Sequence, residues 1–253
     1  MAIRNILKKK TMIHQAINSN KCIAVIGANG FVGSNICNEI ESQDSFNLVK
    51  VVRGDNIAEK IRTADIVIHA ANPAKRYFAN NNPKIDYSET IEKTEEIINL
   101  CSGKKIVLIS SLSARTQLNT TYGRYRKACE ILANFNKNLV IRLGPMFGGE
   151  RTQDTLHEIM NGNAVYISGE TKYSYTSVEY SSATVVKSLN TEGLIEIGAK
   201  NSIKLQEIAD YFKTDCIFSG FDDTQIANSN TSDSQDAYEV IEYCLKSFRV
   251  NHE

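Results

Sequence analysis

The sequence predicts an α/β protein built on a doubly wound parallel sheet with a small C-terminal lobe, and three observations lead to this prediction. Short apolar runs alternate with segments of helical periodicity from residue 21 onward. The first run ends in three glycines spaced by three and continues as an amphipathic segment. The alternation becomes irregular after Gly144, where the smaller lobe is expected to begin.

Six apolar runs are expected to form the strands of the sheet, because each is short, apolar and bounded by polar or turn residues. They span residues 22–26, 48–52, 66–69, 106–110, 139–143 and 193–197. Between and after them, helical spacing predicts helices over residues 31–41, 87–101, 122–134, 203–212 and 237–248.

The glycines after the first strand are the strongest functional signal in the chain. Gly27 permits a tight turn, Gly30 removes a Cβ that would block a pyrophosphate, and Gly33 lets the following helix pack closely on the strand. The N-terminus of that helix offers free N–H groups and a positive dipole end to phosphates. The pattern predicts a dinucleotide-binding site; the alternative is a structural βα turn without a ligand.

The predicted dinucleotide-binding domain spans residues 21–148. Residues 149–253 are expected to form mainly a substrate lobe, with 176–198 returning to the sheet of the first domain. Residues 1–20 form an N-terminal extension that mixes basic and apolar side chains. The extension has two interpretations, an amphipathic helix on a membrane surface or a leading helix that packs on the domain or frays.

Composition excludes several classes of protein. The formal net charge is zero, so no basic field favours nucleic acid. The six cysteines include no CxxC pair, which indicates a reducing compartment and argues against a disulfide or a metal. No apolar run approaches the roughly 20 residues that cross a bilayer, and the N-terminus lacks a signal-peptide core. We therefore expect a cytoplasmic protein with no nucleic-acid partner, no membrane span and no metal.

Arg53 bears on the choice of cofactor. It lies about 20 residues after the last glycine, where an NAD-binding unit usually carries an acidic residue for the ribose 2′-hydroxyl. A guanidinium can bind a 2′-phosphate bidentately, whereas a carboxylate would repel it. The sequence therefore predicts a preference for NADP(H). NAD(H) remains the alternative, because Asp55 lies close by and Arg53 has an equally simple interpretation as a solvated strand end.

A serine and a tyrosine helix follow the fourth predicted strand. Ligands of a doubly wound sheet bind at the carboxyl ends of its strands, so Ser111 is expected beside a nicotinamide. Tyr122 and Arg126 are four residues apart and share a helix face, whereas Lys127 points about 100° away. A tyrosine whose pKa is lowered by cations can protonate the alkoxide left by hydride transfer, and a serine can orient the carbonyl. Taken singly, each residue also fits a structural role.

Five segments in order resemble the motifs of one enzyme family. They are GANGFVG at 27–33, DIVIHAA at 65–71, ISSLSA at 109–114, YGRYRKACE at 122–130 and RLGPMFG at 142–148. They are similar to its GxxGxxG loop, DVVIHLAA strand, serine strand, YxxSKxxxE helix and RPxxxYGP turn. Over residues 21–212 the chain resembles the extended short-chain dehydrogenase/reductase family, also called the NAD-dependent epimerase/dehydratase family.

The resemblance implies a Rossmann-type domain, a nicotinamide cofactor, a nucleotide sugar as substrate and a homodimer paired through the tyrosine helix. In catalysis, Ser111 would orient the carbonyl, Tyr122 would be the acid/base, and Arg126 would lower the tyrosine pKa and hold the ribose. The expected cofactor-binding residues are Gly27, Asn29, Gly30, Phe31, Val32, Gly33, Arg53, Ala70, Ala71, Asn72, Tyr122, Arg126 and Pro145.

The chain departs from the family pattern in several places. Arg126 stands where the family has a lysine, and arginine is larger, forked and unable to give up its proton. The segment after the second strand is so short that the family's third strand is expected to be missing or merged. Tyr173 stands where sugar-nucleotide members carry an arginine for the diphosphate. Arg151, Lys172 or the loop after Gly148 are the alternative phosphate ligands.

Two other polar sites favour structural interpretations. His69 ends a strand and is expected to be a packed, hydrogen-bonded histidine rather than a catalytic one. Asp222 and Asp223 lack a third ligand at fitting spacing, so a solvated turn is favoured over a metal site.

The sequence as a whole predicts an NADP(H)-preferring oxidoreductase that reduces or epimerises a keto group on a nucleotide-activated sugar. Two alternatives stay open. The first is a non-catalytic dinucleotide-binding protein of the same fold, because the family lysine is absent. The second is a reductase of a non-sugar carbonyl, because the arginine for the diphosphate is absent.

Overall fold

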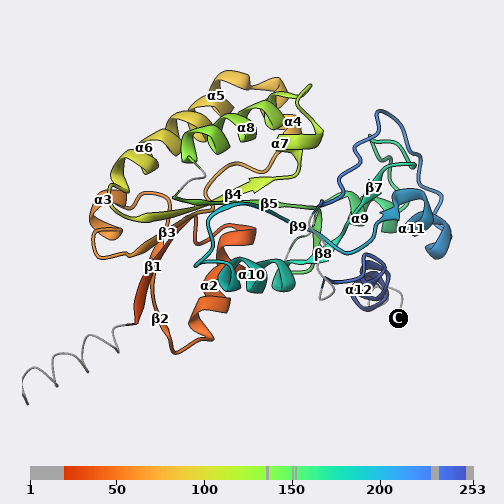
Figure 1. The fold of residues 1–253 in the computed structure, drawn as a ribbon. Helices are drawn as coiled ribbons and strands as arrows, with labels where there is room; N and C mark the ends of the chain where they lie inside the picture. Colours follow the sequence, from red (N-terminus) through yellow and green to blue (C-terminus); the bar gives the residue numbers. More distant parts are fainter. Residues whose placement is uncertain (1–19, 135–136, 150, 152, 229–233, 249–253) are drawn as a thin grey trace, which may run out of the picture.

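The computed structural model describes residues 20–134, 137–149, 151, 153–228 and 234–248. The expectations for residues 1–19 lie outside the described residues. A six-stranded parallel sheet forms the centre of the molecule in the order β2-β1-β3-β4-β5-β9 (Figure 1). Its strands are β1 (Lys21–Ile26), β2 (Phe46–Val51), β3 (Ile66–His69), β4 (Lys105–Ser111), β5 (Leu139–Leu143) and β9 (Gly193–Ile197). The six predicted strands are confirmed, with ends displaced by no more than two residues.

Helices cover both faces of this sheet, as the prediction of a doubly wound fold requires (Figure 1). On one face α2 (Phe31–Glu41) packs against α10 (Val178–Lys187). The other face carries α5 (Pro83–Tyr87), a π-helix η1 (Ser88–Glu92), α6 (Lys93–Leu100) and α8 (Thr121–Ala133). The predicted helix at 87–101 is therefore η1 followed by α6.

The strands are buried on both faces because successive side chains point to opposite sides. In β1, Ile23 and Val25 enter the core beneath α2 and α10. Ala24 and Ile26 enter a second core with Ile97 of α6. A short apolar run was the sequence signal for such a strand, and the two cores explain why no polar residue interrupts it.

The third strand of the family is missing from the described part of the chain. A doubly wound sheet of the common order 3-2-1-4-5-6 has a strand outside its second one. Here β2 is the edge, and the single turn of α3 (Ile57–Lys60) leads from it toward β3. The short connection predicted this outcome. The turn that follows β2 therefore lies at an open edge, where Arg53 is exposed.

The C-terminal part has a smaller core of its own. Its elements are α9 (Thr155–Met160), β7 (Lys172–Tyr173), β10 (Ile203–Lys204), α11 (Leu205–Phe212) and α12 (Glu239–Phe248). The prediction of one helix over 203–212 is wrong at its start, because residues 203–204 pair with β7. The predicted helix at 237–248 begins at Glu239.

Two short strands connect this part to the sheet. They are β6 (Met146–Phe147) and β8 (Thr176–Ser177), which pair in parallel. After β8 the chain enters α10 and then β9, which pairs with β5. The strand β9 thus belongs to the main sheet. The division into two domains at residue 148 and the return of residues 176–198 to the first domain stay predictions. In the described residues, no helix combines the length and the apolar character needed to cross a bilayer.

Candidate functional site

A cavity of about 940 Å³ lies at the carboxyl ends of the central strands. Its wall comes from the glycine loop after β1, the turn after β2, the ends of β3 and β4, and the start of α8. The predicted site residues that line it are Gly27, Asn29, Gly30, Phe31, Val32, Arg53, Ala70, Ala71, Asn72, Ser111, Tyr122, Arg126 and Pro145. The fold therefore brings all but one of the predicted residues to one cavity.

The exception is Gly33, which lies inside α2 against the glycine loop. A Cβ at Gly33 would stand 2.0 Å from the carbonyl oxygen of Gly27, so no other residue fits without moving the backbone. Gly27 itself has φ +88°, a conformation that favours glycine, and a Cβ there would meet Ala70 and Ala71 at 2.8 Å. Close packing of loop, helix and β3 therefore requires both glycines.

The N-terminus of α2 opens on this cavity. Gly30 is the N-cap and supplies no side chain to the first turn, so the N–H groups of that turn are available to an anion. Beside it, the guanidinium of Arg151 lies 4.1 Å from the ring centre of Phe31 and lines the cavity. Of the alternative phosphate ligands named from the sequence, Arg151 lies at the cavity and Lys172 does not.

The turn after β2 separates the roles of Arg53 and Asp55. Asp55 accepts a hydrogen bond from the backbone N–H of Val52 at 2.9 Å and lies 3.9 Å from the Nζ of Lys60. Its carboxylate thus closes its own turn. Both residues line the cavity, but Arg53 is exposed and Asp55 is half-buried. The basic residue is therefore the more available of the two for a ligand.

Ser111, Tyr122 and Arg126 meet at the other end of the cavity. Tyr122 and Arg126 lie on one face of α8, with the guanidinium carbon 4.8 Å from the tyrosine ring centre. Arg126 is 3% exposed and donates a hydrogen bond to the carbonyl of Pro73. Lys127 instead lies 3.4 Å from Glu130 and is not part of the cavity wall. The prediction that Tyr122 and Arg126 share a helix face, with Lys127 pointing away, agrees with this arrangement.

The environment of Tyr122 shifts its pKa. Burial raises the pKa, but the charges of Arg126 and Arg76 and hydrogen bonding with Arg126 and Ser111 outweigh burial and leave it below the ordinary value. A tyrosine with a lowered pKa exchanges a proton near neutral pH more readily than an ordinary one. The site can therefore perform acid/base chemistry at the Tyr122 hydroxyl.

Two buried donors on the cavity wall have no protein partner. They are Nη1 of Arg126 and Nδ2 of Asn72. A buried donor without a partner is costly, so such atoms are expected to bind a ligand or water. Together with the glycine loop, they fit a dinucleotide whose phosphates lie on α2 and whose ribose lies near Arg126.

His69 lies beneath the cavity and does not line it. It is 1% exposed, and its Nε2 is 3.0 Å from the hydroxyl oxygen of Thr94. Burial, followed by the charges of Arg126 and Lys93, lowers its pKa to about 3. The imidazole is therefore neutral near pH 7, in agreement with the prediction of a packed, hydrogen-bonded histidine.

The prediction of a solvated turn at Asp222 and Asp223 is wrong for Asp223. This carboxylate is 1% exposed and forms an ion pair with Arg76, a cavity residue that the sequence analysis missed. The partners are 147 positions apart, so no local pattern links them. The described residues contain no cluster of three His, Cys, Asp or Glu side chains arranged for a metal ion.

Other cavity residues also escaped the sequence analysis. Gln225 lies two positions after Asp223, and Glu89 and Lys93 come from the helices that follow β3. Their signal is weak, because polar residues in a loop or on a helix face are common in any sequence. For Arg76, the one available signal is that it follows β3, a strand that ends at the cofactor motif.

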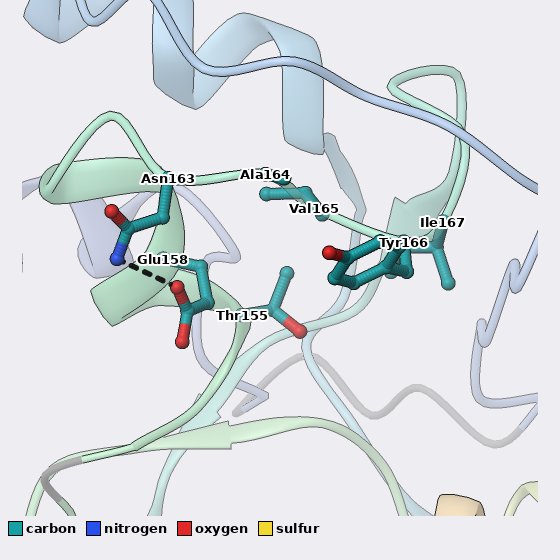
Figure 2. A pocket seen from close by; sticks show the side chains of 7 residues that line it. All are labelled: Thr155, Glu158, Asn163, Ala164, Val165, Tyr166 and Ile167. Atoms are coloured by element: carbon teal, nitrogen blue, oxygen red, sulfur yellow. Dashed lines mark hydrogen bonds between the residues drawn. The ribbon is translucent and has the colours of Figure 1, made fainter.

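A second cavity of about 450 Å³ lies in the C-terminal part (Figure 2). It contains none of the predicted site residues. Asn163 closes one side by donating a hydrogen bond to Glu158 at 2.8 Å. The residues that line it are Thr155, Glu158, Asn163, Ala164, Val165, Tyr166 and Ile167.

Comparison with known proteins supports the fold assignment. No protein-family model matches the chain. A curated relative, UDP-2-acetamido-2,6-beta-L-arabino-hexul-4-ose reductase of Pseudomonas aeruginosa, is 28% identical over 116 residues. The match spans 43% of this chain and 29% of that protein. The chain thus spans less than a third of the length of this relative.

Solved structures cover nearly the whole chain. MoeE5 in complex with UDP-glucose and NAD has a TM-score of 0.68 at 17% identity and covers 88% of this chain and 92% of its own. The dTDP-4-dehydrorhamnose reductase of Yersinia enterocolitica has a TM-score of 0.70 at 18% identity and covers 88% and 98%. Nucleotide-sugar 4-epimerases and a 5,6-dehydratase are also similar. The predicted fold and the resemblance drawn from the five motifs are confirmed at the level of the fold.

Proposed function

We propose that this chain, which has the fold of the extended short-chain dehydrogenase/reductases, is an NAD(P)-dependent oxidoreductase that acts on a nucleotide-activated sugar. The observation that carries the proposal is the meeting of the glycine loop with Ser111, Tyr122 and Arg126 in one cavity. The curated relative is named as a reductase of a UDP-linked hexulose. The structure of MoeE5 holds UDP-glucose and NAD.

In this proposal, some residues of the cavity bind the cofactor and others take part in the reaction. The glycine loop and the N-terminus of α2 hold the dinucleotide phosphates, and Arg126 holds the ribose. A bound nicotinamide supplies or accepts a hydride. Ser111 orients the substrate oxygen by a hydrogen bond, and Tyr122 gives that oxygen its proton or takes it away. Arg126 keeps the phenolate form of Tyr122 accessible.

The finer proposal is reduction or epimerisation of a keto group, with NADP(H) preferred. One assay separates these reactions from the alternatives. A reductase consumes NADPH when given a keto-sugar nucleotide, and an epimerase interconverts sugar isomers without net consumption. A non-catalytic binder does neither, although it binds the cofactor. A reductase of a non-sugar carbonyl consumes NADPH only with carbonyl compounds that carry no nucleotide.

We expect Arg53→Ala to weaken NADPH binding by about ten- to a hundredfold, the loss of one or two charge-assisted hydrogen bonds. NADH lacks the 2′-phosphate, so its affinity should stay the same. Calorimetric titration of both cofactors measures the effect. The matched control is Lys60→Ala, which removes a neighbouring charge outside the cavity. Equal losses for NADPH and NADH would contradict the assignment of Arg53 to the phosphate.

We also propose a cytoplasmic homodimer that pairs through α8. Ile131 of α8 is 66% exposed, and Ile85 of α5 is 54% exposed. These helices lie on the same side of the sheet (Figure 1). Light scattering at several protein concentrations tests the proposal, because Ile131→Glu should convert a dimer to a monomer.

A further inference from the structure

Arg76 is held at the cavity by a buried carboxylate. It begins the short helix α4 (Arg76–Asn81), and its guanidinium donates a hydrogen bond to Asp223 from the C-terminal half of the chain. The Tyr173 hydroxyl donates to the same carboxylate oxygen, and Gln225 Nε2 lies 3.1 Å from it. Three donors therefore converge on Asp223, and they fix the position of the Arg76 charge.

A hydrogen bond also joins the helix of this arginine to the helix of Tyr122. Asn80 of α4 accepts a hydrogen bond from the backbone N–H of Thr121 at 3.2 Å, and Thr121 is the first residue of α8. Arg76 and Tyr122 both line the cavity. The cation and the phenol thus lie on two helices that a hydrogen bond joins.

Tyr122 shares the cavity wall with two arginines. The guanidinium carbon of Arg126, on the same helix, lies 4.8 Å from the ring centre. Arg76 lines the same cavity from α4, and its charge, like that of Arg126, lowers the pKa of Tyr122. Arg126 is also engaged by the carbonyl of Pro73. In this chain, positive charge near the phenol therefore comes from two side chains that different parts of the fold hold in place.

We propose that Arg76 is a second positive charge of the active site, positioned by Asp223, that stabilises the phenolate form of Tyr122. The inference rests on the proposed function, because that function assigns Tyr122 its acid/base role. It goes beyond that function because it makes the acid/base residue dependent on Asp223, a residue of the C-terminal half. Arg76 is thus a positioning residue that acts through Tyr122.

The competing role for Arg76 and Asp223 is a cross-link between two parts of the chain. A cross-link stabilises the fold without a specific effect on Tyr122. Breaking it from either side would loosen the cavity, and the pKa of Tyr122 would move in the same direction in both cases. A charge effect instead has opposite signs for the removal of a cation and of an anion.

The test is an NMR titration of the full-length protein labelled with ¹³C at the tyrosine Cζ. The Tyr122 resonance is the one that disappears in Tyr122→Phe. Arg76→Gln should raise the pKa of Tyr122 by about one unit, and Arg76→Lys should raise it less because a positive charge remains. Asp223→Asn, which keeps the side-chain size, should lower it.

Arg115→Gln is the matched control. Arg115 also forms an ion pair with a buried carboxylate, donating to both oxygens of Glu196 at 2.8 Å. Like Arg76, it contacts the C-terminal segment, here through the carbonyl of Ile226, but it does not line the cavity. Its substitution should leave the pKa of Tyr122 unchanged.

An unchanged pKa in Arg76→Gln, or a rise in both Arg76→Gln and Asp223→Asn, would overturn the proposal. If Arg76→Gln does not fold, the opposite shifts expected for Asp223→Asn and Arg76→Lys still decide the question. The titration needs no substrate. The expected shifts in a protein that turns over no substrate would therefore reject the proposed function while leaving the charge effect established.

Discussion

Tyr122→Phe is expected to reduce turnover by about 10²–10⁴-fold, the usual contribution of a positioned general acid or base. The phenol hydroxyl is the group that exchanges a proton with the substrate oxygen, and phenylalanine keeps the ring but not the proton. Because the glycine loop is untouched and Tyr122 is only one of the cofactor-binding residues, the affinity for NADPH should fall far less than turnover. Steady-state kinetics and calorimetric titration measure the two quantities separately.

Tyr125→Phe is the control for this variant. Tyr125 lies on the same helix and packs edge to face against Tyr87, with ring centres 5.7 Å apart. It is not part of the cavity wall, so the loss of its hydroxyl should leave turnover unchanged. Retention of full turnover in Tyr122→Phe would remove the phenol from the mechanism.

Glu130→Ala is expected to lower the free energy of unfolding by about 3–5 kcal/mol, as the loss of one partner of a buried ion pair does. Glu130 is fully buried and accepts hydrogen bonds from Nε and Nη2 of Arg142, both at 2.7 Å. It also accepts a hydrogen bond from Ser110 at 2.8 Å. The substitution leaves the guanidinium of Arg142 buried, with Glu196 at 3.1 Å as its remaining carboxylate.

Denaturant unfolding of the parent protein and of Glu130→Ala measures this loss of unfolding free energy. The control is Glu242→Gln, which removes the same kind of charge from an exposed pair with Lys246 at 3.9 Å. Exposed pairs contribute about 0–1 kcal/mol, so the control should unfold nearly like the parent protein. A loss below about 1 kcal/mol for Glu130→Ala would show that Glu196 alone compensates Arg142.

Local patterns account for what the sequence predicted correctly. The strand at 66–69 and the helix at 31–41 have the predicted ends, because uninterrupted burial and the glycine loop determine them within a few residues. The pairing of Tyr122 with Arg126 follows from helical phase alone. The missing strand after β2 follows from the length of its connection.

Long-range pairing accounts for what the sequence did not predict. Residues 203–204 form a strand only because β7 lies opposite, 30 positions earlier along the chain. Asp223 resembles a solvated turn residue until Arg76 is placed beside it. Two-residue strands and single ion pairs carry no periodicity, so the C-terminal part was the least predictable.

The most direct test of the central claim is thermal unfolding with NADPH, NADH, NADP and NAD, alone and with a panel of nucleotide sugars. A ligand that binds only the folded state raises the Tm, by an amount that grows with its concentration. We expect a rise with NADPH that exceeds the rise with NADH, and a further rise with one nucleotide sugar. Gly30→Val should abolish the cofactor effect, because a side chain there would occupy the pyrophosphate site. If none of the four dinucleotides raises the Tm, the assignment of this cavity to a nicotinamide cofactor is contradicted.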